Sequence, residues 1–198
     1  AEIDAITSNK DEATFENTIL AYDDAGQMLA QTELVFGMLC AAETNDRMQA
    51  LQEQAMPLLA AHRDKIRLDD KLFVRVKEVY DRRAALGLDA EQMRLLQKTY
   101  DSFVRAGALL DAEQKARLKE INGQLSLTAV KFGNNILAEN NNFVLELKSD
   151  ELDGLPAGIR DAAREKARQM GKGDKWVFTL HKPSLIPLLT YSTTRDLR

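Results

Sequence analysis

Residues 99–137 read TYDSFVRAGALLDAEQKARLKEINGQLSLTAVKFGNNIL, and this stretch decides the fold. Asp111 and Gln114 can satisfy each other's backbone donors at a helix start. Beyond that start, apolar positions recur at alternating steps of three and four, as expected of a helix with one buried face. These positions are Leu118, Ile121, Leu125, Thr128, Phe132 and Ile136. We therefore expect a long helix from Ala112 to about Asn140, paired antiparallel with the helix before it and buried along this stripe.

The first helix with a clear start lies upstream. Thr14 is a good N-cap residue, and apolar side chains at helical spacing follow it as far as Leu39. Gly26 and Gly37 weaken this helix locally. We expect one helix here, with its apolar face buried.

The same reasoning predicts the middle helices. Asn45 can start a helix that Pro57 should kink, because proline removes a backbone donor and its ring collides with the preceding turn. The next helix ends at Gly87, a favourable residue for a left-handed C-terminal turn. Asp89 and Gln92 then repeat the reciprocal cap predicted for Asp111.

The pattern changes at Asn140. Residues 143–148 and 175–180 alternate and are rich in strand-forming types, and a helical segment lies between them. The predicted fold is mainly α, an antiparallel helical bundle with long helices plus a strand–helix–strand excursion near 143–181. The predicted domains are a helical lobe at 1–140, the excursion at 141–182, and the start of a truncated connection to an absent catalytic domain at 183–198.

Composition argues against some partners. The chain is 44% hydrophobic and 29% charged, with a net charge of −4, so no excess of positive charge favours nucleic acid or an anionic membrane. The basic stretch Lys65–Arg83 is interleaved with acidic residues and is typical of a solvated helix face. The longest apolar run, Leu34–Ala42, is far shorter than the ~20 residues that span a bilayer. We expect no nucleic-acid or membrane partner.

The residue types that carry chemistry are scarce. The chain has one cysteine and two histidines, and neither His62 nor His181 has the His-Glu-x-x-His spacing that places two zinc ligands on one helix face. Cys40 lies in an apolar run, as a buried structural thiol would. Tyrosines on apolar stripes indicate core packing with the hydroxyl at its rim; they are Tyr22, Tyr80 and Tyr100. We therefore predict no catalytic, cofactor-binding or metal-binding residue in this chain.

A set of short motifs nevertheless resembles one family in order and spacing. The motifs are Thr14–Ile19, Leu59–Ile66, Leu72–Val76, Arg94–Leu96, Phe103–Leu109, Ile121–Asn122, Phe132–Leu137, Gly154–Pro156, Pro183–Ser184, Tyr191 and Arg195–Arg198. Together they are similar to the amino-terminal half of the thimet-oligopeptidase-like zinc metallopeptidases, the group of oligopeptidase A and peptidyl-dipeptidase. The segments Val79–Arg83 and Tyr100–Leu109 favour the peptidyl-dipeptidase branch.

The resemblance implies a function for a larger parent protein. It implies a mostly helical enzyme that hydrolyses short peptides in a channel, with one zinc held by a His-Glu-x-x-His helix in the carboxy-terminal half. That half is missing from this sequence, so we expect no cofactor in this chain and no peptidase activity from it alone. The chain resembles the helical wall that narrows the channel, and its expected partners are the absent catalytic domain and short peptides.

Other questions stay open at this point. The alternative to a peptidase fragment is a stand-alone helical interaction module without catalysis. Apolar stripes left exposed on the isolated chain would favour a dimer. The compartment is undetermined: the cytoplasm is favoured, and the periplasm would follow if an upstream signal had been removed.

Overall fold

The computed structural model describes all residues 1–198. They form two compact units, unit 1 at Ala1–Lys131 and unit 2 at Phe132–Arg198. Helices dominate both, and one two-stranded sheet accompanies them, so the predicted mainly α class is confirmed. The domain division predicted from the sequence, at residues 140 and 182, stays a prediction.

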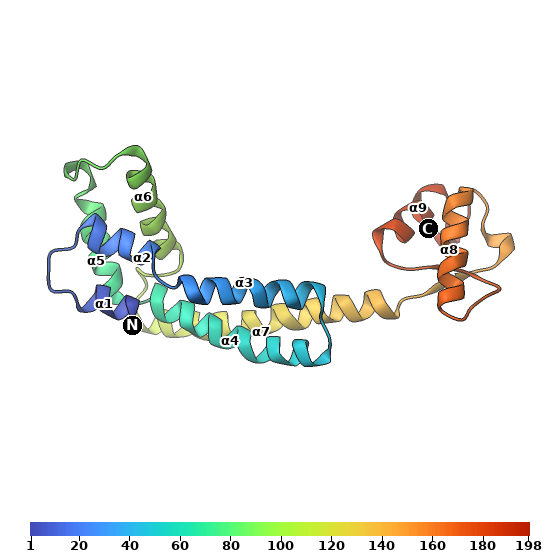
Figure 1. Ribbon diagram of the computed structural model, residues 1–198, viewed down its shortest axis with the longest axis horizontal. Coiled ribbons are helices and arrows are strands. Elements are labelled where there is room, and N and C mark those ends of the chain that lie inside the picture. The colour runs from blue at the N-terminus through green and yellow to red at the C-terminus, as the bar shows by residue number, and fades with distance from the viewer. The chain divides into compact units, whose positions relative to one another are not determined.

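Unit 1 is built from helices alone (Figure 1). They are α1 (Glu2–Ser8), the π-helix η1 (Phe15–Leu20), α2 (Ala21–Asp23), α3 (Gln27–Ala42), α4 (Asp46–Arg67), α5 (Asp70–Asp81), a 3-10 turn (Arg83–Ala85), α6 (Ala90–Arg105) and the first part of α7 (Ala112–Asn142).

The predicted helix starts are confirmed. The Asn45 side chain accepts a hydrogen bond from the Met48 amide at 3.1 Å and caps α4. At α6, Asp89 accepts from the Gln92 amide at 2.8 Å while the Gln92 side chain accepts from the Asp89 amide at 3.1 Å. Asp111 and Gln114 make the same two bonds at α7, at 2.8 and 3.2 Å. Local side-chain chemistry thus sets where these helices begin.

The prediction of a single helix from Thr14 to Leu39 is wrong. Thr14 does cap a helix, since its Oγ1 accepts from the Asn17 amide at 3.1 Å. That helix ends after α2, however, because Gly26 takes a left-handed conformation with φ of 82°. Glycine adopts this conformation without steric cost, so the residue expected only to weaken the helix divides it.

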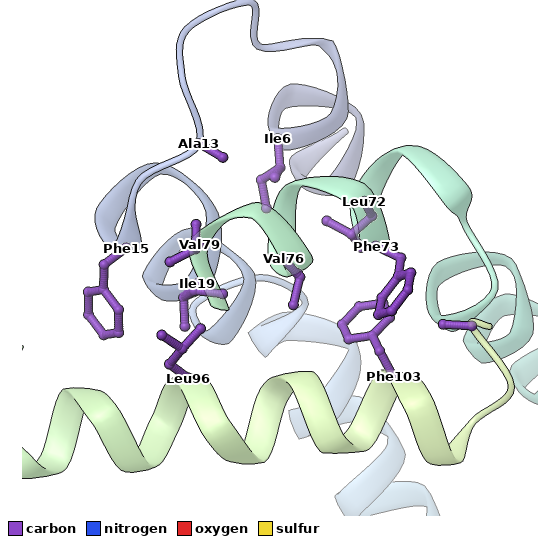
Figure 2. Close-up of a cluster of buried hydrophobic side chains, with 11 residues drawn as sticks. Ile6, Ala13, Phe15, Ile19, Leu72, Phe73, Val76, Val79, Leu96 and Phe103 are labelled. Carbon is purple, nitrogen blue, oxygen red and sulfur yellow. The ribbon is translucent and has the colours of Figure 1, made fainter. Parts of the chain in front are cut away.

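The main core of unit 1 lies between α5, α6 and η1 (Figure 2). Phe73 of α5 and Phe103 of α6 face each other with ring centroids 6.1 Å apart, and Ile19 reaches Leu96 from η1. The tyrosines pack around this core as predicted: Tyr80 and Tyr100 stack at 3.8 Å, and the Tyr80 hydroxyl donates to Gln97 at 3.0 Å. The rigid aromatic cluster fixes α5 against α6.

The helical arm, defined as α3, α4 and residues 112–131 of α7, is the second part of unit 1. Two successive residues of α4 tie it together: Arg63 pairs with Glu33 of α3 at 2.6 Å, and Asp64 accepts from the Asn122 side chain of α7 at 2.8 Å. The long helix was expected to pair with α6, but α6 packs on α5 instead (Figure 1). That predicted pairing is therefore wrong.

The predicted buried stripe of α7 is also wrong. Leu118 is half-buried and Thr128 is exposed, while Ile121, Leu125, Phe132 and Ile136 are 43% to 65% exposed. The buried residues of α7 are Lys115, which pairs with Asp70, and Val130. The apolar stripe lies about 100° around the helix from the face that makes these contacts. The helical period of the sequence identified the apolar stripe of α7. It did not identify which face of the helix packs against the rest of this chain.

Unit 2 contains the only sheet. Strands β1 (Leu145–Leu147) and β2 (Trp176–Phe178) run antiparallel with Leu145 opposite Phe178. Helix α8 (Ala157–Gln169) lies between them in sequence, α9 (Lys182–Tyr191) follows, and 3-10 turns occur at Ser149–Glu151 and Arg195–Leu197. The predicted strand–helix–strand excursion is confirmed. Its core is formed by Leu147, Leu152, Leu155, Ala163, Phe178 and Leu188.

Candidate functional site

The structure does not bring together the cysteine and the two histidines that were considered as candidate site residues. Cys40 is half-buried in α3, His62 is exposed on α4, and His181 is exposed at the start of α9 in unit 2. No three histidine, cysteine, aspartate or glutamate side chains gather in an arrangement that could hold a metal ion. No helix has both the length and the apolar content needed to cross a membrane. That this chain contains no site residue stays a prediction.

The N-terminal cavity, of about 400 Å³, is a hollow of unit 1 that side chains of several helices line. It lies among α1, α2 and the end of α4. Its polar lining includes Glu2, Asp4, Tyr22, His62, Lys65 and Asp69. One space is thus lined by carboxylates, an imidazole, an ammonium group and a phenol. Groups of these types can act as general acids or bases, so their hydrogen-bond partners decide whether they are free to do so.

Two carboxylates of this cavity accept hydrogen bonds from backbone amides, and a third, Asp4, pairs with the N-terminal ammonium group at 3.1 Å. Glu2 accepts from the Gly26 amide at 2.8 Å, which holds α1 against the turn before α3. Asp69 accepts from the Leu72 amide at 2.9 Å and caps α5. Burial raises the pKa of the Tyr22 phenol, so it stays protonated at neutral pH. These groups stabilise helix ends and form no nucleophile–base pair.

The strand cavity, of about 370 Å³, lies in unit 2 between the end of α7, α8 and β2. Phe143, Ile159 and the fully buried Phe178 give it an apolar floor. Lys166 and His181 stand among its polar lining residues. The cavity is therefore an apolar hollow with cationic or ionisable groups at its edge.

The hydroxyl groups near the strand cavity also have structural partners. The Ser184 Oγ accepts from the Thr179 amide at 2.9 Å and so secures the turn into α9. The His181 Nδ1 lies 3.5 Å from the Thr179 hydroxyl. A serine nucleophile needs a base at its own hydroxyl. Here Ser184 and His181 each contact Thr179, and they do not form a nucleophile–base pair with each other.

Two charged contacts frame the sheet of unit 2. Glu146 of β1 forms an ion pair with Lys172, and that hydrogen bond holds the pKa of the Glu146 carboxyl below its ordinary value. The Arg164 guanidinium of α8 lies 5.1 Å from the centre of the Trp176 ring. Both contacts attach neighbouring segments to the strands.

Arg75 is a buried polar residue with several long-range hydrogen bonds that was not predicted from the sequence. Its guanidinium is buried, and its Nη1 donates to the carbonyl oxygens of Asn9 and Asp11, each at 3.0 Å. Its Nη2 donates to the Asn17 side chain at 3.0 Å, and its Nε has no partner. The available signal was an arginine on the otherwise apolar stripe of α5. Its contacts hold the segment between α1 and η1, which is a structural role.

The chain is similar in sequence to known proteins. The chain is 37% identical over 199 residues to the dipeptidyl carboxypeptidase of Escherichia coli K12, and 36% identical over 196 residues to that of Salmonella typhimurium LT2. These matches cover 100% and 98% of the chain. Its homologues over the full chain are thus dipeptidyl carboxypeptidases, and weaker matches extend to oligopeptidase A and a thimet-like oligopeptidase. No family model matches it.

The match is stronger to the dipeptidyl carboxypeptidases than to oligopeptidase A. Oligopeptidase A of Haemophilus influenzae is 25% identical over 187 residues, covering 93% of the chain. The chain spans only 29% and 28% of the two dipeptidyl carboxypeptidases, in their amino-terminal part. It therefore aligns with the amino-terminal part of these proteins and with no more than that part.

Proposed function

We propose that this chain is the amino-terminal, non-catalytic part of a peptidase that removes dipeptides from the carboxyl ends of short peptides. One observation carries the proposal: the match to dipeptidyl carboxypeptidase extends over the whole chain at 37% identity. The lower identity to oligopeptidase A, 25%, makes internal cleavage of peptides the second choice.

The proposed catalytic metal lies outside these residues. Zinc in such an enzyme polarises the scissile carbonyl and activates water. Such a site needs three protein ligands, and no three suitable side chains of this chain gather in one place. The residues present do not fit a zinc site, and we derive no catalytic step through them. The zinc ligands and the general base belong to the remaining part of the polypeptide.

The proposed role of the chain itself is to form part of the wall of the substrate channel. Its support is the rigidity of its packing. The fully buried Leu72, Val76, Leu96 and Phe103 fix α5 on α6 in unit 1, and Leu147 and Phe178 fix the sheet in unit 2. A wall that admits unfolded peptides and excludes folded proteins must keep its shape, and close packing provides this.

The test uses the full-length gene product and an N-terminally blocked pentapeptide. We expect mass spectrometry to find the carboxy-terminal dipeptide and the blocked tripeptide. The matched control is the same peptide with a carboxy-terminal amide, which should be cleaved much more slowly because the free carboxylate is missing. Removal of metal by a chelator should abolish cleavage, and zinc should restore it.

Two outcomes would overturn parts of this proposal. Equal cleavage of the free and amidated peptides at an internal bond would replace dipeptide release by oligopeptidase activity. A full-length product that cleaves neither peptide and instead binds a protein partner through these helices would support the stand-alone interaction module.

A further inference from the structure

The exposed side of α3 has an unusual composition. Met28, Leu34, Val35, Met38 and Leu39 are 47% to 82% exposed. At 3.6 residues per turn they lie within an arc of about 140°, which we call the outward face of α3. The polar residues on this side are uncharged: Gln27, Gln31 and Thr32. A solvated helix face normally carries charged side chains, and this face has none.

The only charged residue of α3 lies on the opposite side. Glu33 is half-buried and forms its ion pair with Arg63 of α4 at 2.6 Å. Phe36 and Cys40 are half-buried on the same side. The helix thus directs its charge toward its neighbour and its largest apolar area away from it, which reverses the usual arrangement of an amphipathic helix.

Other contacts in the helical arm follow the same pattern. Helix α7 meets α4 through the bond from Asn122 to Asp64, while Ile121 and Leu125 are exposed. Gly37 lies in the middle of α3, and a Cβ added there would meet no atom within 4 Å. Glycine inside a helix costs stability relative to alanine and has no packing reason within this chain. Gly37 lies about 60° beyond the edge of the outward face, so it is not part of that face.

We propose that the outward face of α3 is a docking surface for the remainder of the same polypeptide, which covers it with an apolar surface. This rests on the proposed function, in which these residues are one part of a longer peptidase. The chain is 29% and 28% of the length of the two dipeptidyl carboxypeptidases, so most of such a protein lies outside it. An uncharged apolar face selects an apolar, folded surface and gives nothing for a charged ligand to pair with.

The experiment measures thiol reactivity in the full-length protein after Cys40→Ala and the replacement of any cysteine in the remaining sequence have removed all native thiols. Leu34→Cys and Met38→Cys report on the outward face. Lys98→Cys is the matched control, an exposed position on the charged side of α6. Each variant is labelled with a maleimide in the folded protein and in denaturing urea, and the ratio of the two rates gives its protection.

We expect protection of about tenfold or more at Leu34→Cys and Met38→Cys, and little at Lys98→Cys. The same two thiols should react rapidly in the 198-residue chain, where nothing covers them. Rapid labelling of all three thiols in the full-length protein would overturn the inference. Protection in the full-length protein that is lost on dilution would also overturn it, because a second copy would then cover the face.

The readout does not depend on peptidase activity. Protected thiols in a full-length protein that cleaves no peptide would support the docking surface while the proposed function failed. Unprotected thiols in an active dipeptide-releasing enzyme would overturn the docking surface and leave the proposed function intact.

Discussion

At the residue scale, Arg75 joins α5 to a distant part of the chain through three side-chain hydrogen bonds, and a single substitution removes all of them. Its guanidinium is the shared donor for two carbonyl oxygens and one side-chain oxygen of residues 9–17. Replacing it by methionine keeps much of the volume and removes these three part-buried, charge-assisted hydrogen bonds. We expect Arg75→Met to lower the free energy of unfolding by about 2 to 4 kcal/mol. Urea unfolding followed by circular dichroism measures this loss.

The control for Arg75 is Arg94→Met on the exposed side of α6. An exposed arginine without buried acceptors should change the free energy of unfolding by no more than about 0.5 kcal/mol. Equal losses in the two variants would show that the buried hydrogen bonds of Arg75 contribute little.

The Glu146–Lys172 pair gives unit 2 a small stabilisation that depends on pH. Because the hydrogen bond from Lys172 lowers the pKa of Glu146, the folded state binds this proton less readily than the unfolded chain. The resulting stabilisation is present above the unfolded value of about 4.3 and is lost as the pH falls through the native pKa. Lys172→Met should raise the pKa of Glu146 toward its ordinary value, as measured by an NMR titration of the carboxyl carbon.

Lys166→Met is the control for this titration, since Lys166 is a lysine of the same unit outside the pair. It should leave the titration midpoint of Glu146 where it is. A midpoint that moves equally in both variants would indicate a general charge effect and count against the specific pair.

Gly154 is the residue whose backbone leaves no room for a side chain. Its φ is 80°, and a Cβ there would overlap the carbonyl oxygen of Tyr191. Gly154→Ala should therefore destabilise unit 2 by about 2 kcal/mol or more, through backbone strain and this collision. Gly158→Ala, four residues on in α8, meets no atom within 4 Å and should be neutral or slightly stabilising. The fluorescence of Trp176 during urea unfolding separates the two.

Among the elements, the reciprocal cap at the start of α7 is the clearest local determinant. Asp111 accepts from the Gln114 amide at 2.8 Å, so Asp111→Ala should cost about 1 kcal/mol. Asp111→Asn keeps an acceptor oxygen and is the matched control, with only a small loss expected. Thermal unfolding by circular dichroism tests both, and a similar loss in the two variants would mean that charge, rather than the hydrogen bond, stabilises the helix start.

Elements set by local chemistry were predicted from the sequence, and those set by distant contacts were not. Asp89 and Asp111 indicated two helix starts because each bonds to a backbone amide three residues away. The position of α7 beside α4 depends on Asn122 meeting Asp64, 58 residues apart, and no local pattern contains that contact. The stripe of Ile121 and Leu125 was found by its period but assigned to the wrong side.

The candidate sites were predicted less well than the helices for the same reason. The N-terminal cavity brings Glu2 and Asp4 near His62 and Lys65, so its lining comes from segments about sixty residues apart in sequence. The apolar residues of α3 illustrate a second limit: they follow a helical period, yet they face outward from this chain. Periodicity identifies an apolar surface and does not say which part of a protein covers it.

At the scale of the whole molecule, the proposed function divides catalysis and support between different parts of one polypeptide. The 198 residues contribute two packed units, and the family match covers them from end to end. The proposed zinc and general base lie in the part of the protein beyond them. The outward face of α3 is the proposed point of attachment between the two parts.

The most direct test compares the full-length protein with the isolated 198-residue chain on the same N-terminally blocked pentapeptide. We predict that the full-length protein, loaded with zinc, releases the carboxy-terminal dipeptide, and that the 198-residue chain releases none at equal concentration. Release of dipeptide by the 198-residue chain alone, or no cleavage by the full-length protein, would contradict the assignment of this chain as the non-catalytic part of a peptidase.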